Sequence, residues 1–171
     1  MRFKLLSVIA LSMLAVACSD KPKDAATADT TATTVAPSSS SSTTTTSIAP
    51  GSLADFQKNV GDRVFFDYDK SDLSVDARAT LSRQADWLKK YHVSLVVEGH
   101  CDERGTREYN LALGERRANA VKNFLVAQGV PASGLSTISY GKERPAVVGD
   151  NEAAWAQNRR GVSVPQNVPA S

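Results

Sequence analysis

The chain has 171 residues, 42% of them hydrophobic, and its 20 Lys and Arg against 18 Asp and Glu give a formal net charge of +2. This length suits one domain with additional segments. A nucleic-acid-binding protein would carry a clear basic excess, and a disulfide framework would need more than the two cysteines present. We therefore predict neither a nucleic-acid partner nor a fold held by disulfides.

Residues 1–17 have the pattern of a secretory signal peptide. Arg2 and Lys4 form a positive start, residues 5–16 an apolar centre, and Ala17 is the small residue before a cleavage site. An uncleaved membrane anchor is the alternative, but the apolar run is short for a membrane span. Removing this segment leaves eighteen basic against eighteen acidic side chains.

Residues 14–18, Leu-Ala-Val-Ala-Cys, resemble the lipobox of bacterial lipoproteins, although Ala15 stands where leucine is usual. The resemblance implies cleavage before Cys18 and acylation of that cysteine. Buried methylenes contribute about 0.8 kcal/mol each, so more than one acyl chain makes a stable membrane anchor. Ser19 follows the cysteine, which in similar lipoproteins implies delivery to the outer membrane.

The segment after the cysteine is composed mainly of Thr, Ser, Ala and Pro, and residues 38–46 are all hydroxylated. Such a composition cannot bury enough apolar area to offset the entropy lost on ordering. We therefore predict that residues 18–52 comprise the lipidated cysteine and a disordered linker. About 30 residues of random coil span roughly 30 Å, enough to hold a domain away from a membrane.

Residues 53–165 have the composition of a globular domain, and a loose tail over 166–171 follows. Residues 63–68 are rich in strand-forming types, which predicts the first strand. Ser74 is a candidate N-cap for a helix with apolar residues at helical spacing. Residues 93–97 are nearly all apolar, which predicts a central strand covered on both faces.

A second, longer helix is predicted from the N-cap Thr106 to Gln128, with Gly129 in the left-handed position that ends it. Gly114 inside this helix costs roughly 1 kcal/mol relative to alanine, so we expect close backbone packing there. The remaining predicted elements are a strand over 137–140, a short helix over 151–160 and a last strand over 161–164. The order βαβαβ(α)β predicts an α+β fold.

Two charged residues stand out near the centre of the sequence. Asp102 follows the central strand, and Arg117 lies on one face of the long helix. If that helix packs beside the strand end, an anion and a cation border one cleft. Arginine binds a carboxylate through two parallel bonds and aspartate suits an ammonium, so we predict a site for a small zwitterion. An internal Asp102–Arg117 salt bridge fits the spacing equally well. If Arg117 faces the cleft, Arg117→Ala should leave the domain folded.

Catalytic and metal sites find little support in the sequence. His100 and Cys101 are adjacent, so their side chains should point to opposite faces of a strand and not form a nucleophile–base pair. His92, His100, Cys101 and Asp102 match no zinc-binding spacing. Nothing beyond the number of carboxylates supports a glycosidase. We predict a binding module that is not an enzyme, with no metal and no cofactor apart from the covalent lipid on Cys18.

Five segments together resemble the OmpA-like peptidoglycan-binding domain: residues 65–70 (FFDYDK), 98–106 (EGHCDERGT), 109–121 (YNLALGERRANAV), 135–141 and 151–160. The resemblance covers residues 62–164. It implies an α/β sandwich in which helices pack on a mixed sheet.

The resemblance also implies a function. Members of this family bind the stem peptide of uncrosslinked cell wall without covalent chemistry. Their strand-end aspartate and helical arginine hold the free amine and the carboxylate of meso-diaminopimelate, and Asp102 and Arg117 occupy these positions. Other ligand-facing positions of the family match Tyr68, Asp69, Arg104, Asn110 and Leu113. Cys101 stands where threonine is common, and Tyr68 where phenylalanine is usual.

The partners implied by the resemblance are peptidoglycan, TolB (the periplasmic propeller of the Tol system) and other Tol-system proteins, with the outer membrane reached through the lipid on Cys18. The expected role is to tether the outer membrane to the cell wall and to join envelope constriction at division, with the domain in the periplasm. An interaction protein whose main partner is TolB is the alternative. A wall hydrolase is a third hypothesis.

Overall fold

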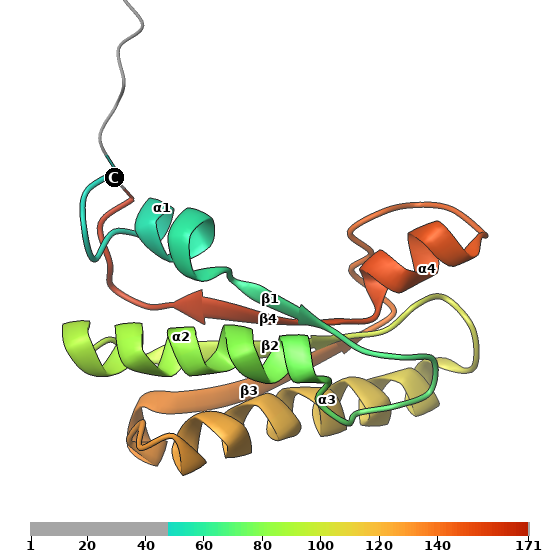
Figure 1. The fold of residues 1–171 in the computed structure, drawn as a ribbon. Helices are drawn as coiled ribbons and strands as arrows, with labels where there is room; N and C mark the ends of the chain where they lie inside the picture. Colours follow the sequence, from blue (N-terminus) through green and yellow to red (C-terminus); the bar gives the residue numbers. More distant parts are fainter. Residues whose placement is uncertain (1–47, 171) are drawn as a thin grey trace, which may run out of the picture. The chain divides into compact units, whose positions relative to one another are not determined.

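The computed structural model describes residues 48–170 (Figure 1). The predicted signal peptide over 1–17, the lipidation site Cys18 and the linker up to residue 47 lie outside the described residues. Within residues 48–170, no helix combines the length and the apolar character needed to cross a membrane.

The described region is built on a four-stranded sheet with the strand order β1-β4-β2-β3. The strands are β1 (Arg63–Phe65), β2 (Leu95–His100), β3 (Leu135–Gly141) and β4 (Arg160–Pro165). β4 pairs antiparallel with both β1 and β2, whereas β2 and β3 are parallel. The mixed sheet and the α+β class predicted from the sequence are therefore confirmed.

Two long helices, α2 (Val75–Tyr91) and α3 (Arg107–Ala127), lie side by side on one face of this sheet (Figure 1). α3 packs on β2 and β3, while α2 packs on β1. The remaining helical elements are α1 (Leu53–Asp55), the π-helical segment Phe56–Val60, the 3-10 turn Ala132–Gly134 and α4 (Glu152–Asn158).

The capping signals read from the sequence are confirmed. The Ser74 hydroxyl accepts a hydrogen bond from the amide of Ala77, and the Thr106 hydroxyl accepts one from Tyr109. Gly129 has a φ of 88°, the left-handed conformation expected after the helix end. Each side-chain cap satisfies one amide that the first helical turn leaves without a partner.

The central strand β2 is covered by helices on one face only, so the prediction of cover on both faces is wrong. Leu95 and Val97 are buried in the core between the sheet and the helices. Val96 and Glu98, which alternate with them, are only partly buried. A run of apolar residues does not distinguish full cover from the half cover that β-branched residues on an open face also tolerate.

The N-terminal helical segment was not predicted, and it changes the environment of Trp87. The Phe56 ring is fully buried and lies 4.9 Å from the Trp87 ring, measured between centroids. The Trp87 indole N–H donates to Asp55 Oδ2 at 2.8 Å. Trp87 is therefore a core residue, because a segment distant in sequence covers it.

α3 and the sheet approach each other closely at two glycines. A Cβ atom on Gly99 of β2 would lie 1.8 Å from the main-chain oxygen of Gly114 on α3. A Cβ atom on Gly114 would lie 2.3 Å from the Ser139 hydroxyl. The expected close packing at Gly114 is confirmed. Because Asp102 and Arg117 each follow one of these glycines by three residues, this contact sets the distance between the strand end and the helix.

Candidate functional site

A hollow of about 540 Å³ lies beyond the carboxyl end of β2, and we call it the site pocket. Three segments line it: the loop after β1, the end of β2 with its following loop, and the first half of α3. All seven site residues predicted from the sequence line this pocket. The full set is Tyr68, Asp69, Cys101, Asp102, Arg104, Gly105, Thr106, Tyr109, Asn110, Leu113 and Arg117.

Arg117 is entirely buried, and its guanidinium is bound to the main chain. Its Nε donates to the carbonyl of Lys70 at 2.8 Å, Nη1 to that of His100 at 2.9 Å and Nη2 to that of Asp67 at 3.0 Å. Burial lowers the pKa of Arg117, but the guanidinium of an arginine stays charged in proteins. Arg117 thus joins the loop after β1 to the end of β2. The expectation that Arg117→Ala leaves the domain folded depends on Arg117 facing the cleft, whereas its full burial and three main-chain bonds predict a loss of stability.

Asp102 does not pair with Arg117, so the alternative of an internal salt bridge between them does not describe this fold. The Asp102 carboxylate accepts hydrogen bonds from Arg104 Nη2 at 2.6 Å and from Arg159 Nη1 at 3.4 Å. Burial raises the pKa of Asp102, but the bonds from Arg104 outweigh it and the pKa is lowered overall. Asp102 is therefore an anion held between two arginines at the pocket wall.

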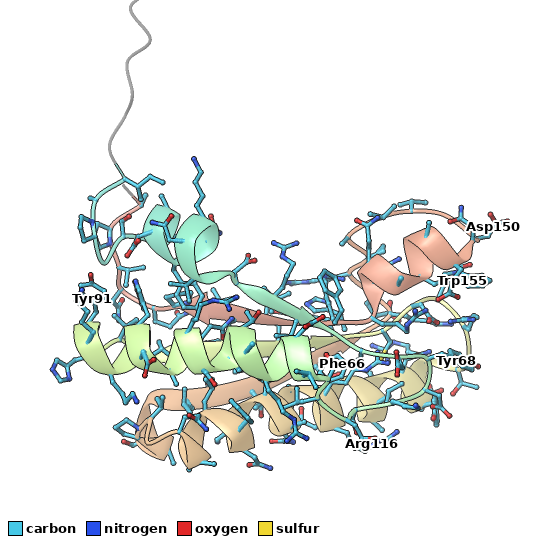
Figure 2. The ribbon with its side chains drawn as sticks, in the orientation of Figure 1. Phe66, Tyr68, Tyr91, Arg116, Asp150 and Trp155 are labelled. Atoms are coloured by element: carbon cyan, nitrogen blue, oxygen red, sulfur yellow. The ribbon has the colours of Figure 1, made fainter. Side chains whose placement is uncertain are left out.

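Arg104 lies between two aromatic rings. Its guanidinium carbon is 4.0 Å from the centroid of the Tyr68 ring and 4.0 Å from that of the Trp155 ring. Figure 2 shows Tyr68 and Trp155 at the same end of the molecule. The Trp155 indole N–H donates to Glu103 Oε1 at 3.1 Å, which orients the ring. Stacking and ion pairing together favour this position of Arg104.

α4 and the residue that follows it supply two contributors that the sequence analysis did not identify, Trp155 and Arg159. Arg159 is buried, and besides Asp102 it binds the carbonyl of Phe66 at 3.0 Å and Glu152 at 2.6 Å. Both residues lie in a segment that carried the family resemblance, but no spacing rule places α4 beside the loop after β2. Only the tertiary fold brings them together.

The opposite wall of the site pocket is formed by the first turns of α3. The Tyr109 hydroxyl donates to Asp69 Oδ1, and Asp69 has a φ of 57°. The Asn110 amide donates to the carbonyl of Arg104 at 2.7 Å and so fixes the loop that carries the arginine. Leu113 adds a buried apolar surface. Of the two carboxylates that line the site pocket, Asp69 is exposed and Asp102 is buried.

Cys101 and His100 do not form a catalytic pair. The Cys101 thiol is buried and donates to the carbonyl of Asn110 at 3.3 Å, and burial raises its pKa. His100 instead contacts Glu98, with Nε2 3.3 Å from Oε2. A thiol that stays protonated and has no base beside it is a poor nucleophile.

His100 is 2% exposed, and its Nδ1 has no hydrogen-bond partner among the described residues. Burial, followed by the nearby charge of Arg160, lowers the pKa of His100 from 6.5 to about 4. The imidazole is therefore neutral near neutral pH. It must take up a proton when the chain unfolds in mildly acidic solution.

This difference predicts an acid-sensitive stability. Because the pKa of folded His100 lies below the unfolded value, its contribution is complete above about pH 6.5 and is lost as the pH falls towards about 4. We expect the free energy of unfolding to fall by on the order of 3 kcal/mol across this range, measured by urea denaturation. His100→Gln should remove most of this slope, whereas the exposed His92→Asn should keep it. The lowered pKa values of Asp55 and Asp102 act only below their ordinary value of 3.8.

The chain belongs to the OmpA family, whose model matches residues 65–159. Within that family it is similar to peptidoglycan-associated lipoproteins. It is 60% identical over 119 residues to that of Agrobacterium fabrum, covering 69% of this chain and 67% of the relative. It is 61% identical over 115 residues to that of Mesorhizobium japonicum, covering 67% and 68%. The crystal structure of the peptidoglycan-associated lipoprotein from Burkholderia pseudomallei matches with a TM-score of 0.63 at 39% identity, covering 66% of this chain and 98% of that one. The family resemblance inferred from the motifs is thus confirmed.

Proposed function

We propose that this domain binds the stem peptide of peptidoglycan without catalysis and holds its meso-diaminopimelate residue in the site pocket. The similarity to peptidoglycan-associated lipoproteins supports peptidoglycan as the ligand class. One observation carries the finer assignment. Two carboxylates, from Asp69 and Asp102, and two guanidinium groups, from Arg104 and Arg117, border a single hollow of about 540 Å³. Such a site complements a ligand with both an amine and a carboxylate.

The contacts within the pocket suggest how the charges are shared. Arg117 donates three of its five N–H groups to main-chain carbonyls, and two N–H groups remain for a ligand carboxylate. Because its side chain is fully buried, the ligand reaches it only when a neighbouring side chain moves. Asp69 accepts one bond and has an oxygen without a partner within residues 48–170, so it receives the ammonium directly. Asp102 adds negative potential and accepts the ammonium when Arg104 moves aside.

The expected affinity of one domain is modest. Charge-assisted hydrogen bonds contribute roughly 1.5–3 kcal/mol each, and the cost of ordering the peptide and the moving side chains subtracts from the sum. Many copies bound to one polymer then hold it strongly, because each new contact forms at a high effective concentration. Weak, reversible binding by each copy and strong binding by many copies together are the properties that a tether needs.

Titration calorimetry tests the assignment with two peptides that differ only in the free amine of the diaminopimelate residue. We expect the peptide without the amine to bind roughly tenfold more weakly, because one charge-assisted bond is lost. Asp69→Asn keeps a residue that tolerates the left-handed conformation and should reduce this difference. Equal affinities of the two peptides for the wild-type protein would contradict the proposed site.

The membrane end of the tether depends on Cys18, and we include its acylation in the proposal. Acyl chains on this cysteine would anchor the protein in the outer membrane, with the binding domain in the periplasm. Cys18→Ser should release the protein from isolated outer membranes, whereas Ser19→Ala should not. Retention of the Cys18→Ser protein in the membrane fraction would exclude the lipid anchor.

A second role, in the Tol system, is favoured by the rim of the site pocket. Tyr68 and Tyr109 are 59% and 45% exposed, and aromatic residues of this kind are common anchors of protein interfaces. Binding to TolB on this overlapping surface would link the tether to envelope constriction. Pull-downs on purified peptidoglycan and on periplasmic extract separate the two partners. We expect Tyr68→Ala to lose the capture of TolB and Val126→Ala to retain it.

A further inference from the structure

A second hollow, of about 550 Å³, lies beside the site pocket, and we call it the side pocket. It is bounded by the loop after β1 on one side and by α4 on the other. Phe65, Phe66 and Leu73 supply its apolar lining, and Lys70, Gln157 and Arg159 are among its polar residues. The proposed diaminopimelate contacts use none of the three apolar residues.

The two cationic groups of the side pocket already have carboxylate partners. Lys70 Nζ lies 3.5 Å from Asp67 Oδ2, and Arg159 Nη2 lies 2.6 Å from Glu152 Oε1. Within residues 48–170 the side pocket therefore presents no unpaired cation, and Asp72 adds one carboxylate without a partner. An anion is therefore disfavoured, whereas a polar molecule with hydroxyl or amide donors can bind this carboxylate.

The other lining groups favour a molecule with one apolar face and several hydroxyl or amide groups. The Phe65 side chain is 48% exposed, whereas Phe66 is 4% exposed and closes the base of the side pocket. The carboxylate of Asp72 and the amide of Gln157 make no hydrogen bonds within residues 48–170, so both are available. An aromatic surface next to free hydrogen-bonding side chains suits a pyranose ring, whose C–H face packs on the ring while its hydroxyl and N-acetyl groups are bound at the rim.

The two pockets share a wall. Arg159, which lines the side pocket, donates to the Asp102 carboxylate of the site pocket at 3.4 Å. Arg117 of the site pocket holds the carbonyls of Asp67 and Lys70, both of which line the side pocket. A ligand that extends out of one pocket can therefore reach the other across this wall.

We propose that the side pocket binds the saccharide part of the same cell-wall fragment whose peptide occupies the site pocket. This inference rests on the proposed function, because it assumes that the peptide is bound first. The stem peptide is joined covalently to an amino sugar, and three extended residues span roughly 10 Å. A sugar held at this distance from the bound diaminopimelate residue binds more readily, because the linkage gives it a high effective concentration.

Calorimetry with two matched ligands tests this inference on the full-length chain in detergent micelles. One ligand is the stem peptide, and the other is the same peptide attached to its disaccharide. We expect the disaccharide to strengthen binding roughly five- to tenfold in the wild-type protein. Phe65→Ala and, separately, Gln157→Ala should reduce this gain to about twofold or less and leave the affinity for the peptide alone unchanged.

Ile138→Ala is the matched control for Phe65→Ala, because Ile138 is a 39% exposed apolar residue on β3 and does not line the side pocket. It should preserve the gain from the sugar. Peptide binding with no gain from the sugar in the wild-type protein would overturn the side-pocket proposal and leave the proposed function intact. Equal weakening of both ligands by Phe65→Ala and Gln157→Ala would also overturn it. Absence of binding by either ligand would reject the proposed function itself.

Discussion

Arg117→Met is expected to lower the free energy of unfolding by about 2–4 kcal/mol, because three main-chain carbonyls lose their hydrogen-bond donor. Each carbonyl left buried without a donor costs about 1–3 kcal/mol, and relaxation with entry of water recovers part of the sum. Methionine retains much of the length of the side chain, so the loss reports on hydrogen bonding more than on a cavity. Thermal unfolding should show a fall in Tm of roughly 8–20 °C for a domain of this size.

The neighbouring residue provides the control. Arg116 lies on the same helix but is exposed, and Arg116→Met should change stability by less than about 0.5 kcal/mol. Arg117→Lys separates the two roles of this position. A lysine keeps the charge but cannot reach three carbonyls at fixed angles, so it should destabilise the fold and weaken peptide binding, measured well below Tm. If Arg117→Met unfolded at the wild-type temperature, the main-chain contacts could not be supporting the loop after β1.

The site illustrates what sequence reasoning can and cannot reach. The motif resemblance identified the residues around the site pocket, because family motifs specify positions along the chain. It did not identify their partners. Nothing in the sequence shows that Arg117 binds the carbonyls of Asp67 and Lys70, or that Arg159 approaches Asp102, because these contacts join segments roughly 50 residues apart. The expected pair of opposed charges is instead a network in which each charge has internal partners.

In the fold, too, local features could be predicted from the sequence and tertiary contacts could not. Local signals such as the Ser74 and Thr106 caps were readable because a side chain satisfies an amide three residues away. The helical segment at residues 53–60 was missed because it is short and has no apolar periodicity of its own. It is stabilised by Phe56, which packs on Trp87 more than 30 residues later. The single-sided cover of β2 depends in turn on where both long helices lie, which hydrophobicity alone does not encode.

Gly99→Ala is expected to have the second large effect, because an added Cβ would lie 1.8 Å from the main-chain oxygen of Gly114. No rotamer change relieves a clash between a Cβ and the backbone of a packed helix, so α3 must move away from β2. Overpacking of a well-packed core costs typically 1–3 kcal/mol and occasionally more, and we expect about 3 kcal/mol or more here. Gly114→Ala should cost less, because alanine gains roughly 1 kcal/mol in helix propensity and part of the clash is with the Ser139 side chain.

Gly99→Ala should also weaken peptide binding, and by more than the loss of folded protein alone would explain. Moving α3 away from β2 shifts Arg117 relative to Asp102, and a misplacement of about 1 Å is enough to disrupt a preorganised site. Urea denaturation gives the loss of stability, and calorimetry with the diaminopimelate peptide under folding conditions gives the loss of binding. Gly134→Ala is the control, since the nearest atom to its added Cβ is an ordinary 3.8 Å away. A Gly99→Ala protein with wild-type stability and wild-type binding would show that the contact between these glycines does not determine where α3 lies.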